Sequence, residues 1–114
     1  MATREQLLAW GIRKTDTVDI GDGLTFKVRQ LNAEEITESH NKAKESGASN
    51  ENIAMTAFVI ARSAINEDGS RIFSDEDGHM ILKEFSYQKL GELVEPIFTL
   101  NGILKKQAEQ TEKN

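Results

Sequence analysis

The sequence contains no cysteine, which excludes disulfide bonds, cysteine-ligated zinc and thiol catalysis. Aromatic residues make up only 6% of the chain and apolar residues 38%. No apolar run approaches the roughly 20 residues that a membrane-spanning helix needs, so we expect no membrane association. Small scaffolds with few aromatic side chains often complete their core by association. We therefore expect the protein to form a homo-oligomer.

A basic stripe is also missing from this chain, whose formal net charge is −5. Lys27 and Arg29 share one face of a predicted strand, and Lys105 and Lys106 lie near the end. Binding to a phosphate backbone needs a larger basic cluster, because the neutralisation of phosphates supplies most of the affinity. We expect no nucleic-acid partner.

The apolar pattern predicts an α+β fold, a mostly helical single domain in which an N-terminal β-hairpin is followed by three or four helices. The length of 114 residues suits one domain, expected over residues 1–104 and followed by a polar C-terminal tail over residues 105–114. Before the hairpin, Thr3 and Gln6 have the spacing of a capping box for a short helix that reaches Trp10. Gly11 is expected to end this helix in the left-handed conformation.

Strict alternation around a glycine-rich turn predicts the hairpin, over about residues 17 to 30. The side chains expected on its buried face are Val18, Ile20, Leu24, Phe26 and Val28. Asn32 then has the character of an N-cap for a surface helix over residues 33–45, with Glu35 at the third helical position. Leu31 is expected to pack on Ile36.

The next helix is predicted to be the buried centre of the domain, because it is apolar nearly all round. Its expected core positions are Ile53, Ala54, Ala57, Phe58, Ala61, Ala64 and Ile65. A turn over residues 66–69 follows, Ser74 is expected to cap a further helix, and Ser86 a last one. Pro96 lies inside that last helix and predicts a kink or a break near Glu95.

No residues have the pattern of a catalytic, cofactor or metal site. His40 and His79 lack the spacing of metal ligands. The acidic stretch over residues 66–77 lacks a carboxylate at the first position of a calcium loop and a glutamate at the last. We expect that the protein is not an enzyme.

Two apolar features are candidates for partner binding or self-association. Trp10 either packs at the edge of the core or acts as a docking anchor, since tryptophan is enriched at binding hot spots. The last helix has an apolar seam that is wider than one small core needs, and both a core and an interface role stay open for it. The candidate contacts are Trp10, Leu93, Ile97, Phe98, Leu100 and Leu104.

Three segments of the sequence resemble the tail assembly chaperones of lambda-like siphophages. Residues 28–35 (VRQLNAEE) are similar to that family's joint between a strand and a capped helix. Residues 66–77 (NEDGSRIFSDED) are similar to its acidic turn followed by an apolar pair and a helix cap, and residues 100–104 (LNGIL) match near the end. The chain would correspond to the short, unextended form of the chaperone.

This resemblance implies a protein of the host cytoplasm that is not expected in the mature virion. It would bind the tape-measure protein and keep it soluble while the tail tube assembles. The final residues, Glu112-Lys113-Asn114, can be encoded by a slippery heptamer, and a frameshifted longer form would then also bind the tail tube protein. Two alternatives stay open: a structural virion component, such as a head–tail joining or minor tail protein, and a small regulatory or enzymatic domain outside phages.

Overall fold

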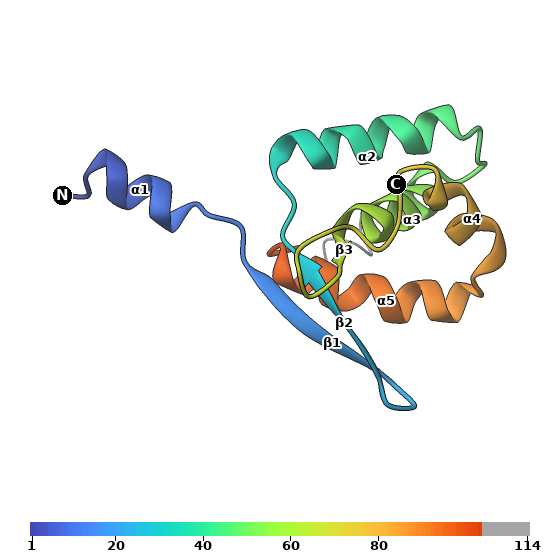
Figure 1. Ribbon diagram of the computed structural model, residues 1–114. Coiled ribbons are helices and arrows are strands. Elements are labelled where there is room, and N and C mark those ends of the chain that lie inside the picture. The colour runs from blue at the N-terminus through green and yellow to red at the C-terminus, as the bar shows by residue number, and fades with distance from the viewer. Residues whose placement is uncertain (104–114) are drawn as a thin grey trace.

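The computed structural model describes residues 1–103, so the expectations for Leu104, the polar tail and the final Lys113-Asn114 pair lie outside the described residues. The predicted α+β class is confirmed, with an N-terminal hairpin and a mostly helical remainder (Figure 1). The elements in chain order are α1 (Arg4–Trp10), β1 (Thr15–Gly21), β2 (Leu24–Arg29), α2 (Ala33–Glu45), α3 (Glu51–Ser63), β3 (Ala64–Ile65), α4 (Asp77–Glu84) and α5 (Tyr87–Leu100).

The hairpin forms as predicted, and its register places Val18 opposite Phe26. The turn contains Asp22 at a φ of +56°, between two glycines that also have positive φ. Val18 and Val28 are buried and Phe26 is half-buried, but Ile20 and Leu24 are 40% and 59% exposed. The apolar face is therefore only partly covered, because the tip of the hairpin extends past the helices (Figure 1).

A short third strand was not predicted. The central helix α3 ends at Ser63, and Ala64 and Ile65 leave it in extended conformation to pair with β2. Ala64 and Ile65 are buried as expected, but they were expected to belong to the helix. A short buried apolar segment does not by itself distinguish a helix from a strand. The Ser63 hydroxyl donates to the Arg29 carbonyl at 2.7 Å and fixes the point where the helix becomes a strand.

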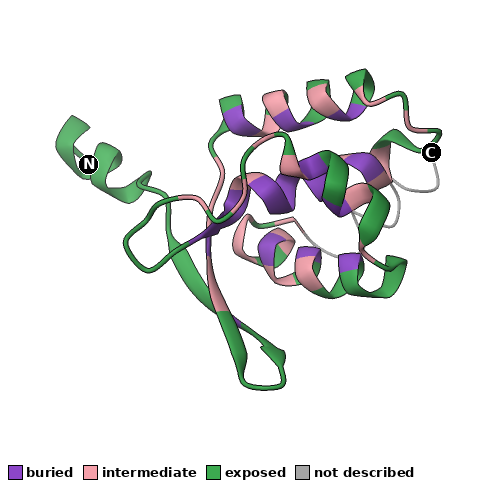
Figure 2. Ribbon diagram, turned by 45° about the vertical axis from the view of Figure 1, so that its right-hand side comes forward, coloured by how far each residue is buried: buried purple, intermediate pink, exposed green. Residues whose placement is uncertain are grey.

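The core is built around α3, as predicted. Figure 2 shows this helix as the most buried element, with α2, α4 and α5 packed around it. The main apolar cluster joins α3 to the sheet, α4 and α5, and a smaller one joins it to α2 through Ala43, Ala54 and Phe58. The fully enclosed aliphatic side chains of the main cluster include Ile60, Ile81 and Ile97.

The helix boundaries confirm some predicted caps and correct others. The Asn32 side chain accepts a hydrogen bond from the Glu35 N–H at 2.8 Å, and the Glu35 carboxylate accepts one from the Asn32 N–H, so the capping box of α2 is complete. Ser86 caps α5 as expected. Gly11 is not left-handed but has a φ of −81°, and its N–H donates to the Leu7 carbonyl.

The expected start of α4 is wrong, and of the kink or break expected near Glu95 the break does not occur. Helix α4 begins at Asp77 without a side-chain cap, and Asp75 before it pairs with Arg62 and Arg71. Helix α5 continues unbroken through Pro96 to Leu100. Proline removes one backbone donor, and the packing of Val94 and Ile97 on either side of it keeps the helix in place.

Candidate functional site

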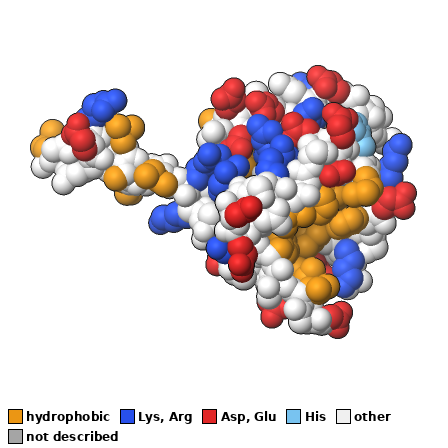
Figure 3. Space-filling model, in the orientation of Figure 1, with side chains coloured by type: hydrophobic (Ala, Val, Ile, Leu, Met, Phe, Trp, Pro, Cys, Tyr) orange, Lys and Arg blue, Asp and Glu red, His pale blue; other side chains and the backbone are white. Residues whose placement is uncertain are grey.

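Helix α1 stands away from the body of the molecule as an arm (Figure 1). Its large apolar side chains, with Ile12 just after it, are exposed: Leu7 by 56%, Leu8 by 58%, Trp10 by 82% and Ile12 by 68%. Every residue from 1 to 12 is exposed, and Figure 3 shows hydrophobic side chains along the arm. An apolar group of this kind marks a binding surface, because burial against a partner would release it from water.

The capping box of Thr3 and Gln6 explains why the arm is helical at its start. The Thr3 hydroxyl accepts from the Gln6 N–H at 3.1 Å, and the Gln6 side chain accepts from the Thr3 N–H at 2.9 Å. Isolated helices shorter than about 12 residues have marginal stability in water. A seven-residue helix with no buried residue in the described structure would therefore gain stability from contact with a partner.

The root of the arm is fixed to the body by side-chain and backbone contacts. The Arg13 guanidinium lies 2.5 Å from the Glu35 carboxylate. The Lys14 N–H donates to the Gln30 side chain at 2.7 Å, and the Gln30 N–H donates to the Lys14 carbonyl at 2.8 Å. The Gln30 side-chain amide donates in turn to the Leu100 carbonyl. These contacts direct the arm away from the hairpin.

Glu35 is the centre of an ion-pair cluster, made of Arg13, Arg29, Glu35, Glu38, Arg62, Arg71 and Asp75. Its carboxylate also lies 3.6 Å from Arg29 and 3.4 Å from Arg62. The Glu35 side chain is only 9% exposed, so its charge depends on these partners. Figure 3 shows the basic side chains gathered on the body near the root of the arm, with acidic side chains beside them.

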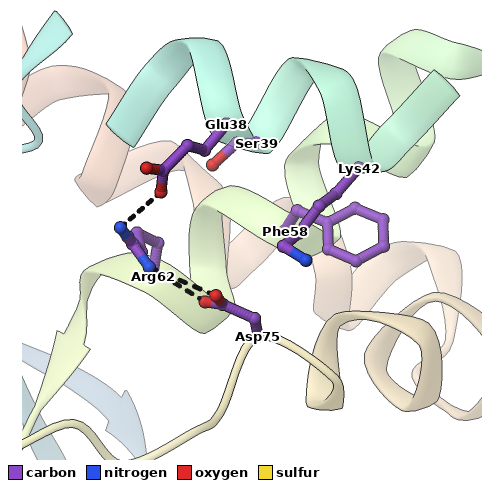
Figure 4. Close-up of a pocket in the computed structure, with 6 residues that line it drawn as sticks. All are labelled: Glu38, Ser39, Lys42, Phe58, Arg62 and Asp75. Carbon is purple, nitrogen blue, oxygen red and sulfur yellow. Dashed lines mark hydrogen bonds and ion pairs between the residues drawn. The ribbon is translucent and has the colours of Figure 1, made fainter. Parts of the chain in front are cut away.

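Arg62 joins this cluster to the loop before α4 (Figure 4). Its guanidinium lies 2.5 Å from Glu38 and 3.0 Å from Asp75, and Arg71 lies 2.7 Å from the same Asp75 carboxylate. The cavity lined by Glu38, Ser39, Lys42, Phe58, Arg62 and Asp75 has a volume of about 10 Å³, which is room for no more than one water molecule. The cluster is therefore a structural clamp between α2, α3 and this loop rather than a substrate pocket.

The cluster shifts the pKa values of its charged groups. Burial raises the pKa of Glu35, but the hydrogen bond from Asn32 and the charges of Arg13 and Arg29 outweigh it and hold that pKa below its ordinary value. Burial likewise raises the pKa of Asp75, and the neighbouring Arg71 and Arg62 bring it below its ordinary value. Both carboxylates are thus stabilised in their ionised form.

A second apolar surface lies between the tip of the hairpin and the first half of α5. It is an open groove with a volume of about 440 Å³. Its apolar lining consists of Ile20, Leu24, Phe85 and Leu93, and its charged lining of Asp22, Glu84, Lys89 and Glu92. Of the residues that form the arm and the groove, only Trp10 and Leu93 were predicted from the sequence as candidate contacts. The others could not be recognised, because only the fold shows which apolar residues stay exposed.

The structure separates the sequence-based contact residues into three groups. Trp10 is on the exposed arm, not at the edge of the core. Ile97 is 0% exposed and belongs to the chain's own core, so it has no surface to offer a partner. Leu93, Phe98 and Leu100 are half-buried and pack against that core. Most of the apolar seam of α5 therefore packs in the core of its own chain.

Both histidines lie away from any arrangement of metal ligands within the described residues. His79 packs edge-on against the Phe58 ring, with the ring centroids 5.1 Å apart. Residues 1–103 contain no group of three or more His, Asp or Glu side chains that is placed to hold a metal ion. None of the helices in this part of the chain is both long and apolar enough to cross a membrane.

The three segments that carried the resemblance meet in space. The first segment supplies Arg29 and Glu35 to the ion-pair cluster, and the second segment supplies Arg71 and Asp75. In the third segment, the Asn101 side chain accepts from the Leu31 N–H at 2.8 Å. These residues therefore have a shared structural role around the root of the arm.

The comparisons with known proteins identify no relatives: no family model, no curated protein and no solved structure matches the chain.

Proposed function

We propose that the protein is a non-enzymatic tail assembly chaperone of a siphophage, and that it binds the tape-measure protein through α1. The observation that carries the proposal is the exposure of Leu7, Leu8, Trp10 and Ile12 on an arm that has no buried residue within the described part of the chain. The resemblance of residues 28–35, 66–77 and 100–104 to that chaperone family supplies the identity of the partner.

The geometry of the arm fits a helical partner. Leu7 and Trp10 are three residues apart within α1, so both are on one side of the helix, and Ile12 follows just after its end. Short amphipathic helices bind apolar stripes of other helices through such spacings. Tryptophan gives a large apolar contact and is common at the energetic centre of interfaces. A long helical protein would need its apolar stripes covered before assembly.

The net charge of the protein also supports a chaperone role. The formal net charge of −5 would add repulsion between coated partner molecules and so oppose their aggregation. The protein would act in the host cytoplasm and leave the tape-measure protein when the tube forms. A head–tail joining or minor tail protein would instead remain in the particle, so mass spectrometry of purified virions separates these two functions.

Co-expression with the tape-measure protein tests the proposal. The wild-type chain should keep the tape-measure protein in the soluble fraction and co-purify with it. A Leu7→Ser/Trp10→Ser variant should lose both effects, since it removes two exposed apolar contacts without touching the core. Tyr87→Ser is the matched control, because Tyr87 is also a large exposed side chain, at 69%, but lies on α5. If the wild-type chain neither solubilises nor retains the tape-measure protein, the proposal is wrong.

A further inference from the structure

The arm and the groove are two uncovered apolar surfaces, and Trp10 of one copy cannot reach the part of the groove at the hairpin tip of the same copy. Arg13 and Lys14 are tied to Glu35 and Gln30, so only the residues before them are free to turn. A strand rises about 3.3 Å per residue, which places Ile20 roughly 16 Å beyond Thr15. Trp10 lies three residues before Arg13 and reaches at most about 10 Å from it. It therefore falls short of the hairpin tip.

We propose that α1 of one copy docks in the groove of a second copy. The apolar side chains Leu7, Leu8 and Trp10 would cover Ile20 and Leu24 at the tip of the partner's hairpin.

The charges of the two surfaces support this pairing. Three acidic side chains, Asp22, Glu84 and Glu92, line the groove with one lysine, Lys89. The free part of the arm, residues 1–12, carries one basic side chain, Arg4, and one acidic side chain, Glu5, so its side-chain charges cancel. The acidic lining repels a second acidic groove but not this arm, so it favours contact between an arm and a groove over contact between two grooves.

The size of the two surfaces favours a reciprocal exchange of arms. A stable interface buries about 800 Å² on each partner, while one tryptophan buries roughly 150–250 Å². In a two-fold dimer each copy gives an arm and receives one, so a single association event covers both arms and both grooves. This also supplies α1 with the packing that a seven-residue helix lacks.

The exchange stands whether or not the tape-measure protein is the client. A client that binds α1 would compete with it, because both contacts use the same apolar side chains. Self-association would then cover the arm until the client is present.

Sedimentation with paired variants tests the arm exchange. Trp10→Ala in the arm and Leu24→Glu in the groove should each raise the dissociation constant of the dimer at least ten-fold. Both positions are exposed, so neither change should lower the melting temperature. Tyr87→Ala, on an exposed α5 side chain that does not line the groove, should leave the dimer unchanged. An equimolar mixture of the Trp10→Ala and Leu24→Glu proteins should form a heterodimer at concentrations where each alone is monomeric, since one intact arm still meets one intact groove.

The absence of native cysteine allows a second measurement by cross-linking. Ala9→Cys on the arm and Glu92→Cys on the groove, mixed and oxidised, should give a disulfide-linked heterodimer. Ala9→Cys mixed with Glu45→Cys, on the exposed side of α2, should not. A wild-type chain that stays monomeric at high concentration would overturn the proposal. So would a dimer that the arm variant weakens but the groove variant does not, because the arm would then dock elsewhere.

Discussion

Gly78 offers the sharpest test of the packing between α3 and α4. A Cβ atom at this position would lie 2.2 and 2.4 Å from two ring carbons of Phe58. Non-bonded carbon atoms in folded proteins do not come this close. The ring cannot move away easily, because Phe58 is only 2% exposed and extends from α3 into a cluster with Ala43 of α2, against which Leu82 of α4 also packs. Gly78→Ala should therefore push α4 away from α3.

The expected loss can be worked out from two opposing effects. Overpacking of a close-packed core costs about 1–3 kcal/mol, while alanine in place of glycine favours a helix by about 1 kcal/mol. Because both contacts would be shorter than 3 Å in an enclosed site, we take the upper part of the overpacking range, about 2–3 kcal/mol, so the net loss of unfolding free energy should be about 1–2 kcal/mol. For a domain of about 100 residues, each 1 kcal/mol lowers the melting temperature by roughly 4–8 °C, so the fall should be about 4–16 °C.

Thermal unfolding followed by circular dichroism measures this loss, and Gly91 provides the matched control. Gly91 lies inside α5 and a Cβ there would meet nothing within 4 Å. Gly91→Ala should consequently stabilise the protein by about 0.5–1 kcal/mol. If Gly78→Ala is as stable as the wild type, or gains stability as Gly91→Ala does, the described contact between Gly78 and Phe58 is wrong.

Three further stability predictions follow from the caps, the core and the ion-pair cluster. Asn32→Ala should cost about 1 kcal/mol in urea unfolding, while Asn32→Asp, which keeps the cap, should cost little. Phe58→Ala should lose roughly 3–5 kcal/mol, and a melting temperature near that of the wild type would contradict its place in the core. The lowered pKa values of Glu35 and Asp75 give stability that is fully present above their ordinary pKa values, 4.5 and 3.8. This stability is lost as the pH falls through the pKa values of the folded protein. Glu35→Gln should flatten that acid dependence in melts between pH 3 and pH 7, and an unchanged slope would contradict it.

The elements whose formation depends on residues close together in the sequence could be predicted. The cap at Asn32 needs only the Glu35 that follows it, and the hairpin needs only its own alternation and turn. The start of α4 could not be predicted in the same way. Asp75 looks like a helix-start residue, but Arg62 and Arg71 bind it, and Arg62 is brought there by the path of α3.

The candidate site was mostly beyond local sequence reasoning. The capping box of Thr3 and Gln6 could be predicted, but Arg71 and Asp75, four residues apart, are not in a helix, so their spacing did not indicate a contact. Arg13 and Glu35 are 22 residues apart in sequence, and no pattern joins them. The sequence also could not show that Ile97 is enclosed while Trp10 is exposed, since both are apolar residues in helices. Exposure depends on how the elements pack together.

The fluorescence of Trp10 tests the central claim, that the arm is the surface which binds the partner. Trp10 is the single tryptophan of the chain and is 82% exposed, so its emission reports on the arm alone. A tryptophan-free segment of the tape-measure protein should be titrated into the dilute protein, with Leu7→Ser as the weakened control. We expect a saturable shift of the emission to shorter wavelengths, and a weaker affinity for the Leu7→Ser control. Binding that is detected by pull-down but leaves the emission of Trp10 unchanged would contradict it.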